Sequence, residues 1–155
     1  MTETDFHKLL MQRFAEFTPH VAECGMRIVA LDRDGADAEL PYRDDWLGDI
    51  ERGVIHTGIV TTLVDSACGA AVLAAIGHIE AIATIDLRMD YLRASRRGLS
   101  LQCRAECHRL TDQVAFARAQ VWQDDPAVPV ATAVGAFMRS PAKRSQFKSA
   151  AEGKA

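Results

Sequence analysis

A long apolar run in the middle of the chain is the strongest constraint on the fold. Asp65 is the only charged side chain between Gly53 and Ile79. Within this run, residues 57–76 are apolar on all sides of a helix, and Gly77 supplies a stop signal. A membrane span is disfavoured, because polar side chains occupy its first half and a carboxylate in mid-span would cost about 2.5–3.5 kcal/mol. We therefore expect a helix buried on most faces inside a protein core.

Size and charge narrow the class of protein. The chain has 155 residues, enough for one domain, and its 18 basic and 21 acidic side chains give a net charge of −3. Nucleic-acid binding usually needs a basic excess, so no nucleic-acid partner is expected. The acidic start lacks the pattern of a secretory signal, which predicts a cytoplasmic protein whose four cysteines are reduced. Cys103, Cys107 and His108 lie close together, but no second ligand pair follows, so no metal site is expected.

The other segments predict one more helix and six strands. Apolar residues at helical spacing predict a helix over residues 4–17 that ends near Pro19. Alternating patterns predict two strands joined by Asp34-Gly35 and four strands after the apolar run, over residues 26–31, 36–40, 82–92, 99–110, 114–123 and 130–139. The short separators between the last four strands predict an antiparallel meander, in which consecutive strands pair, because parallel neighbours need long crossovers.

A sheet of about six strands can bury a single apolar helix only by curling around it. We therefore expect an α+β domain over residues 21–140, preceded by an N-terminal helix within residues 1–20 and followed by a disordered tail over residues 141–155. The back of such a sheet and its edge strands invite a partner, which predicts a homodimer or a dimer of dimers.

The start of the apolar helix and its lone carboxylate are the candidates for chemistry. Thr57 and Gly58 offer backbone N–H groups at the positive end of the helix dipole, where a carbonyl oxygen or oxyanion would bind. Asp65 lies among apolar residues and is either a general base or nucleophile, or a buried group bonded to a neighbour. His56 lies nine residues before Asp65, about 13 Å along a helix. Both can act on one substrate only if they come from different subunits.

These residues resemble the PaaI-like acyl-CoA thioesterases of the hotdog fold, in which a curved antiparallel sheet wraps a long central helix. The resemblance covers about residues 24–140. It is carried by His56-Thr57-Gly58 with Leu63-Val64-Asp65, by the strand from Thr84 to Arg93, and by Val130-Ala131-Thr132-Ala133 with Gly135-Ala136-Phe137-Met138.

The resemblance implies hydrolysis of an acyl-CoA thioester, with an aryl or alkyl acyl group and without a metal or redox cofactor. Asp65 would activate water or attack the thioester carbonyl, and Thr84 would position that water. Thr57 and Gly58 of the other subunit would bind the thioester oxygen, and His56 would shape the turn or contact the thioester. A thiolate leaving group, whose pKa is near 8.5 to judge from cysteine, needs little acid assistance.

Two further expectations concern the last strands. A period of two places Thr84 on one strand face with Asp86, Arg88 and Asp90, and Ile85 with Leu87, Met89 and Tyr91 on the other. The CoA part of the substrate is expected to contact Tyr91, Arg93, Arg97, Arg109, Thr111 and Arg139, because arginine and hydroxyl groups suit phosphates.

The chain departs from the family pattern in three places, and two other functions stay open. Thr57 replaces a usual glycine, Asp49-Ile50 stands where an asparagine is expected, and Ser95 stands near a usual proline. The first two departures favour a non-catalytic acyl-CoA binding or sensor module. The other alternative is a hotdog dehydratase or hydratase acting on hydroxyacyl thioesters, which needs a histidine and a carboxylate facing the same carbons. The placement of Asp65 with Thr84 opposite favours hydrolysis over that chemistry.

Overall fold

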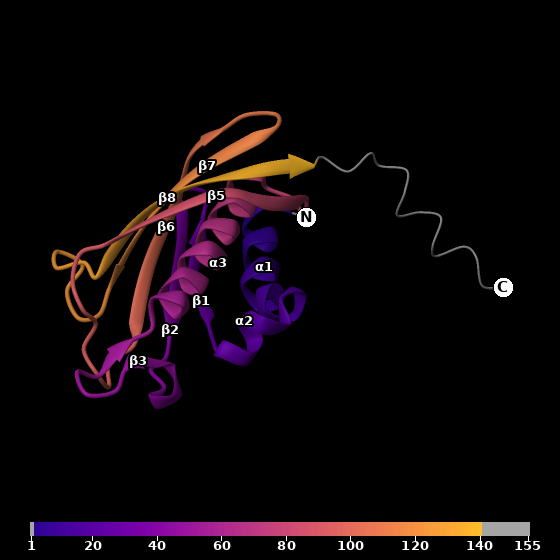
Figure 1. The fold of residues 1–155 in the computed structure, drawn as a ribbon. Coiled ribbons are helices and arrows are strands. Elements are labelled where there is room, and N and C mark those ends of the chain that lie inside the picture. Colours follow the sequence, from indigo (N-terminus) through magenta and orange to yellow (C-terminus); the bar gives the residue numbers. More distant parts are fainter. Residues whose placement is uncertain (1, 141–155) are drawn as a thin grey trace.

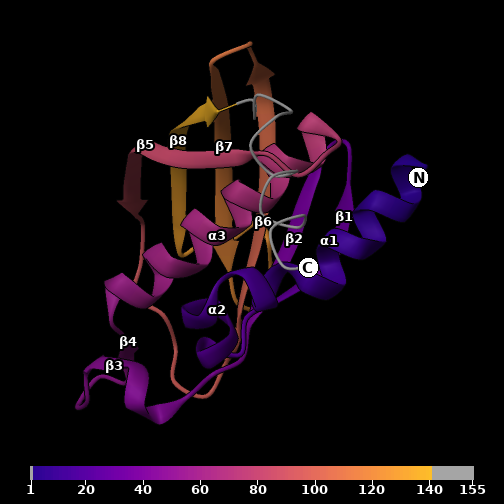
Figure 2. The same cartoon turned by 90° about the vertical axis from the view of Figure 1, so that its right-hand side faces the viewer.

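One antiparallel sheet wraps one long helix. The structure, a computed structural model, describes residues 2–140, so the predicted tail over 141–155 lies outside the described residues. The strands follow the order β1-β2-β6-β7-β8-β5, and every neighbouring pair is antiparallel. Their bounds are Arg27–Asp32 (β1), Gly35–Leu40 (β2), Ala81–Tyr91 (β5), Leu101–Leu110 (β6), Val114–Trp122 (β7) and Ala131–Ser140 (β8). Helix α3, Thr57–Ile76, lies across the inner face of this sheet (Figures 1 and 2). The predicted fold class is confirmed, but the predicted meander was wrong at β5, which pairs with β8 and not with β6. Residues 92–100 between β5 and β6 are long enough to cross the three strand spacings, about 14 Å, that separate them.

Helix α3 is buried because the sheet presents small side chains to it. Ala105, Ala115, Ala117 and Ala131 lie on β6, β7 and β8 and are 0% exposed. Side chains this small let the helix approach the strands closely, and the interior stays densely packed. By length and composition α3 would pass as a membrane span, but half of its most apolar window is buried inside the protein. It is the core helix of the domain.

Two short helices and a small hairpin complete the chain. Helix α1, Glu3–Phe17, is capped by Thr2, and Pro19 follows its end as predicted. Pro19 also begins a second helix, α2 (Pro19–Cys24), that the sequence analysis did not predict. Proline suits the first turn of a helix, where its missing N–H is not needed. A short 3-10 helix and a two-stranded sheet precede α3: η1 (Asp44–Trp46), β3 (Leu47–Asp49) and β4 (Val54–Ile55).

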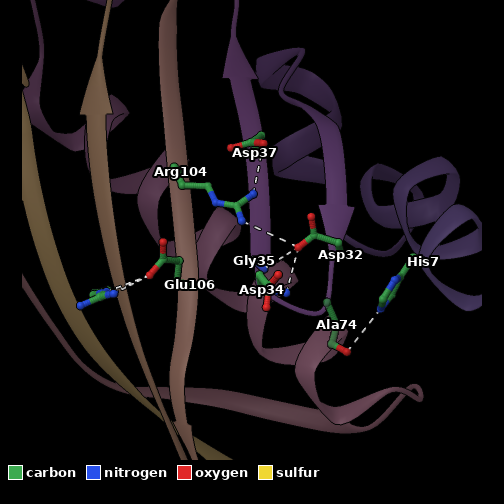
Figure 3. Close-up of polar contacts among 9 residues, drawn as sticks. His7, Asp32, Asp34, Gly35, Asp37, Ala74, Arg104 and Glu106 are labelled. Carbon is green, nitrogen blue, oxygen red and sulfur yellow. Dashed lines mark hydrogen bonds and ion pairs between the residues drawn. The ribbon is translucent and has the colours of Figure 1, made fainter. Parts of the chain in front are cut away.

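Helix α1 covers β1 and the C-terminal part of α3 (Figure 1). Phe6 and Leu10 are buried, each 1% exposed. The buried ring of His7 places Nε2 3.4 Å from the carbonyl oxygen of Ala74 in the last turn of α3 (Figure 3). Apolar packing and this polar contact together hold α1 against the core helix.

The outer face of the sheet is polar. Arg104 on β6 forms ion pairs with Asp37 at 3.1 Å and with Asp32 at 3.7 Å (Figure 3). Arg118 on β7 pairs with Glu106 on β6 at 2.8 Å. One face of the sheet therefore packs on α3 while the other carries charge, the alternation expected of an antiparallel sheet with one buried face.

A buried ion pair closes the sheet beside the C-terminal end of α3. Glu80, immediately before β5, has a side chain that is 1% exposed, and Arg139 on β8 contacts both of its carboxylate oxygens at 3.0 and 2.9 Å. Arg139 also donates to the carbonyl oxygen of Thr111 at 2.6 Å. The hydrogen bonds from Arg139 hold the pKa of Glu80 below its ordinary value, and His78, 3.3 Å away, adds a smaller effect.

Replacing Arg139 by methionine should destabilise the protein in a pH-dependent way. Glu80 would stay buried without its cation, and breaking one side of a buried pair costs about 3–5 kcal/mol at pH 7. Because folding lowers the pKa of Glu80, the pair stabilises the fold fully above the unfolded value, near 4.3, and this contribution is lost as the pH falls through the folded value.

Urea unfolding of wild type and Arg139→Met between pH 3 and pH 7 measures the effect. The gap in unfolding free energy should be largest at neutral pH and shrink below pH ~4. Arg109→Met changes an exposed arginine on β6, at the same end of the sheet, and is the matched control, which should change stability little. A gap that is equally wide at low pH would contradict this role.

Candidate active site

The structure brings the predicted carboxylate and hydroxyl together. Asp65 lies half-buried in the middle of α3, and Thr84 lies on the first part of β5. The Thr84 hydroxyl donates a hydrogen bond to Asp65 Oδ1 at 2.8 Å. The bond orients the carboxylate and joins helix to sheet across 19 residues of sequence.

A β-bulge makes this contact possible, and it corrects the predicted alternation of β5. The register of β5 on β8 shifts between Thr84 and Asp86, so Ile85 is an extra residue. Thr84 pairs with Phe137 and Leu87 with Gly135, both on the inner face, while Asp86 points outward. The prediction that Thr84 shares a face with Asp86 was therefore wrong. Thr84 shares the inner face with Leu87, Met89 and Tyr91, because the extra residue reverses the alternation.

Asp65 and Thr84 line a cavity of about 500 Å³ between α1, α3 and the start of β5. Most of its wall is apolar and comes from Leu10, Phe14, Phe17, Leu73, Ile82 and Phe137. An apolar hollow with a few convergent polar groups is the usual form of a small-molecule site. The carboxylate thus faces a space suited to an apolar ligand.

The N-terminus of α3 offers one free backbone donor. His56 is the N-cap of the helix, and its ring Nδ1 accepts a hydrogen bond from the Gly58 N–H at 3.0 Å. His56 therefore shapes the turn, which is one of the two roles expected for it. It also accepts the hydrogen bond of the Gly58 N–H, so that this predicted donor is not free for a ligand. The Thr57 N–H has no acceptor among the described residues 2–140. It is the group at this end of the dipole that a ligand oxygen can use.

The Thr57 N–H and the Asp65 carboxylate of one chain are too far apart to act on the same bond. Thr57 and Asp65 are eight residues apart on α3, which is about 12 Å along the helix axis. A carbonyl group bonded to the Thr57 N–H is too far from the carboxylate of the same helix to be attacked with its help. The geometry supports the expectation that a second copy supplies one of the two groups.

Tyr91 lies beside the start of α3. Its hydroxyl donates to the Thr57 carbonyl oxygen at 3.0 Å and lies 2.8 Å from Thr61 Oγ1. Tyr91 and Arg93 help to line a second hollow of about 280 Å³ that reaches Thr57. Two of the residues predicted to bind CoA therefore lie next to the predicted thioester oxygen site.

The six residues predicted to bind CoA fall into two groups at opposite ends of the sheet. Tyr91 ends β5, and Arg93 and Arg97 follow it. Arg93 donates to the Pro129 carbonyl oxygen at 2.8 Å, and Arg97 pairs with Asp44 at 3.0 Å. Arg109, Thr111 and Arg139 lie at the other end, near the β6–β7 turn. Arg109 is exposed, whereas Arg139 is largely buried against Glu80. β5 alone spans ten residue steps, about 33 Å, between these ends, so one CoA cannot contact both groups of one protomer.

Two of the departures from the family pattern have structural roles. Ser95, 5% exposed, accepts a hydrogen bond from the Ile55 N–H at 2.8 Å and so fixes β4, which leads into α3. Asp49 accepts a bond from the Arg52 N–H at 3.0 Å in the turn between β3 and β4. The sequence analysis missed the role of Ser95, and nothing in the local pattern distinguishes a buried serine from an exposed one.

The neighbouring cysteine does not act as a nucleophile. Burial raises the pKa of Cys68 to about 12, and the nearby Asp65 carboxylate adds to the shift. The thiol stays protonated at neutral pH, whereas nucleophilic attack needs the thiolate. Within residues 2–140 no three His, Cys, Asp or Glu side chains are grouped to hold a metal ion. Two carboxylates line the cavity, Asp65 and Glu80, and both oxygens of Glu80 are bonded to Arg139.

Comparison with known proteins identifies the family. The Thioesterase superfamily matches residues 52–130, which include α3, β5, β6 and β7. The medium/long-chain acyl-CoA thioesterase YigI of Escherichia coli strain K12 is 23% identical over 147 residues, covering 84% of this chain and 92% of that protein.

Similar solved structures support the same family. A Pseudomonas aeruginosa protein is 37% identical with a TM-score of 0.76, over 84% of this chain and 99% of that one. A mutant of the phenylacetic acid degradation protein PaaI from Thermus thermophilus is 26% identical with a TM-score of 0.69, over 79% and 99%. The fold and the family that the sequence resemblance implied are both confirmed. The chain therefore belongs to the thioesterase superfamily and is a thioester hydrolase of the hotdog fold.

Proposed function

We propose that this protein hydrolyses the thioester of acyl-CoA molecules to a free acid and CoA, and that Asp65 carries the reaction. The observation behind the proposal is the hydrogen-bonded Asp65–Thr84 pair in the wall of a largely apolar cavity. Similarity to an acyl-CoA thioesterase of Escherichia coli supports the CoA part of the substrate. Such a substrate also fits the cytoplasmic location expected from the sequence.

In the proposed mechanism, the thioester carbonyl oxygen binds at the Thr57 N–H and Asp65 acts on the carbonyl carbon. As a general base, Asp65 takes a proton from water while the water oxygen bonds to the carbon and the negative charge moves to the carbonyl oxygen. The tetrahedral intermediate then breaks its C–S bond, and Asp65 returns the proton to the departing sulfur. In the other route, an Asp65 oxygen bonds to the carbonyl carbon, the C–S bond breaks and the CoA thiolate leaves, which gives a mixed anhydride. Water then hydrolyses the anhydride to the free acid and restores Asp65, and the proton released goes to the thiolate. Thr84 orients the carboxylate in either route.

The proposed active unit is a homodimer, alone or within a dimer of dimers, with each site shared between two subunits. β5 is an edge strand of the sheet, and Ile85 and Tyr91 on it and Leu92 just beyond it are 57%, 42% and 52% exposed. An unpaired strand edge with exposed apolar side chains favours pairing with a second copy. Such pairing would bring the Thr57 end of one subunit toward Asp65 of the other. It would also let Arg93, Arg97 and Arg109 from two subunits contact one CoA.

The acyl group is proposed to be aliphatic. The cavity beside Asp65 is lined by leucine, isoleucine and phenylalanine side chains from four elements, α1, α3, β5 and β8. A hollow that extends along a helix suits a chain better than a single ring. The Escherichia coli relative carries medium- and long-chain acyl specificity in its name.

The two alternatives are weaker on this geometry. A dehydratase needs a histidine that acts on the substrate, but His56 caps α3 with its Nδ1 bonded to the Gly58 N–H, and the similar Escherichia coli protein is a thioesterase. A non-catalytic acyl-CoA binding module would use the same cavity, and Thr57 still offers its N–H despite replacing a glycine. Such a binding module would release no thiol from acyl-CoA, whereas a hydrolase would.

Replacing Asp65 by asparagine should abolish most of the activity. The amide keeps the shape and the contact with Thr84 but cannot accept the proton, so kcat should fall about 10²–10⁴-fold. Thiol release from a panel of aryl- and alkyl-acyl-CoAs measures it. Asp86→Asn removes a carboxylate two residues from Thr84 on the outer face and is the matched control, expected to retain full activity. Equal rates for Asp65→Asn and wild type would refute the mechanism.

Replacing Thr57 by proline should remove the thioester oxygen donor without breaking the helix. Thr57 is the first residue of α3, where proline is well tolerated, and His56 before it is already extended, with φ −59° and ψ 132°. Loss of one such donor lowers kcat about 10²–10³-fold. Thr57→Ala loses the side chain but keeps the N–H, and it should stay within a few-fold of wild type. If both variants lose activity alike, the backbone donor is not the cause.

A further inference from the structure

Gly69 occupies the middle of the cavity wall beside Asp65. Asp65, Gly69 and Leu73 follow one another at a spacing of four on α3 and all line the cavity. On the opposite side, Thr84, Ile82 and Glu80 line it in the reverse order of sequence. The cavity therefore runs from the reacting pair, past Gly69, to the buried Glu80–Arg139 ion pair.

The glycine is not required by the packing of the protein itself. A Cβ built on Gly69 would lie 3.8 Å from Ile82 Cδ1, an ordinary van der Waals contact. Glycine inside a helix also costs stability relative to alanine. Its φ is not in the left-handed region, unlike those of Gly25, Gly53, Gly77 and Gly98. Because Gly69 has no side chain, the cavity is open at this position, one turn of helix from Asp65.

The far end of the cavity has a charged boundary. Glu80 is fixed by two hydrogen bonds from Arg139, which is itself bonded to the Thr111 carbonyl oxygen. A methylene chain that reached this pair would gain little, because buried charges that are already satisfied offer it no favourable contact. Ile79, beside Glu80, is 55% exposed, so a longer chain would pass into solvent there.

We infer that Gly69 and the Glu80–Arg139 pair together set the acyl chain length that the enzyme prefers. This inference rests on the proposed function. The acyl chain runs over the bare backbone of Gly69 toward Leu73, in the space that any side chain at position 69 would occupy. From Asp65 to Leu73 the helix rises about 12 Å. An extended chain advances about 1.2 Å per bond, as in a polypeptide of 3.3–3.6 Å per three-bond residue, so about ten bonds fit.

The chain-length profile of kcat/KM tests the inference. For wild type, kcat/KM should rise up to about fourfold per added methylene and level off near ten carbons, because further methylenes are not buried. In Gly69→Leu the added side chain displaces about three methylenes, which lowers kcat/KM for decanoyl-CoA on the order of 50-fold. Butanoyl-CoA, which ends before position 69, should change less than about twofold. Gly69→Ala should show a smaller loss of about fourfold on decanoyl-CoA.

Controls separate this effect from damage to the fold. Ala75→Leu adds the same side chain to a half-buried position of α3 that does not line the cavity, and its profile should match that of wild type. Gly69→Ala improves helix propensity and should melt no lower than wild type, so it keeps the test valid if Gly69→Leu does not fold. A Gly69 variant that lowers kcat/KM equally for butanoyl- and decanoyl-CoA, or leaves the profile unchanged, would overturn the inference.

A binding measurement distinguishes failure of this inference from failure of the proposed function. Calorimetry of decanoyl-CoA and butanoyl-CoA with Asp65→Asn, in which turnover is suppressed, should show tighter binding of decanoyl-CoA. Adding Gly69→Leu should remove that preference. If wild type releases no thiol but this preference is present and is lost with Gly69→Leu, hydrolysis is refuted and the role of Gly69 stands. If wild type hydrolyses acyl-CoA and Gly69→Leu leaves the preference intact, the role of Gly69 is refuted alone.

Discussion

Burial of α3 is the constraint on which the rest of the structure depends. A 20-residue helix that is apolar on nearly all faces needs cover on most of its circumference, and one six-stranded sheet provides it by curling. The alanines on β6, β7 and β8 let the sheet come close. Where the cover is incomplete, near Asp65 and at the start of the helix, α3 presents polar groups. The candidate catalytic groups therefore lie where the sheet does not cover the helix.

A single extra residue in β5 brings together the two side chains of the candidate active site. Without the bulge at Ile85, the strand alternation would direct Thr84 toward the outer face together with Asp86. With it, Thr84 reaches Asp65 while Leu87 and Met89 still pack inward. Gly135 on β8 lies opposite, where an added Cβ would come within 3.1 Å of the Asp86 carbonyl oxygen. A bulge beside the site re-aims one side chain and leaves the rest of the sheet in place.

The sequence predicted those parts of the fold that depend on local patterns. The bounds of α3, residues 57–76, follow from one apolar run, and the pairing of β6, β7 and β8 follows from the short separators between them. The pairing of β5 with β8 was not predicted, because the separator after β5 looked like another turn between neighbouring strands. The family resemblance named Asp65 and Thr84 as partners. The bulge was not predicted, because Ile85, Leu87, Met89 and Tyr91 alternate without a break, and the change of phase between Ile82 and Ile85 is a single step. The buried pair of Glu80 and Arg139, 59 residues apart, was equally hidden, so Arg139 was predicted to contact CoA. The capping role of His56 was among the alternatives.

The central claim is that each active site combines Asp65 of one subunit with the Thr57 N–H of its partner. Asp65→Asn and Thr57→Pro chains carrying different tags can be co-expressed and the mixed dimers purified by both tags. Each variant alone should be inactive, but a mixed dimer contains one site with both groups intact, so it should recover about half of the wild-type kcat. Mixed dimers as inactive as the two parents would show that the groups do not act across subunits, and would contradict the account.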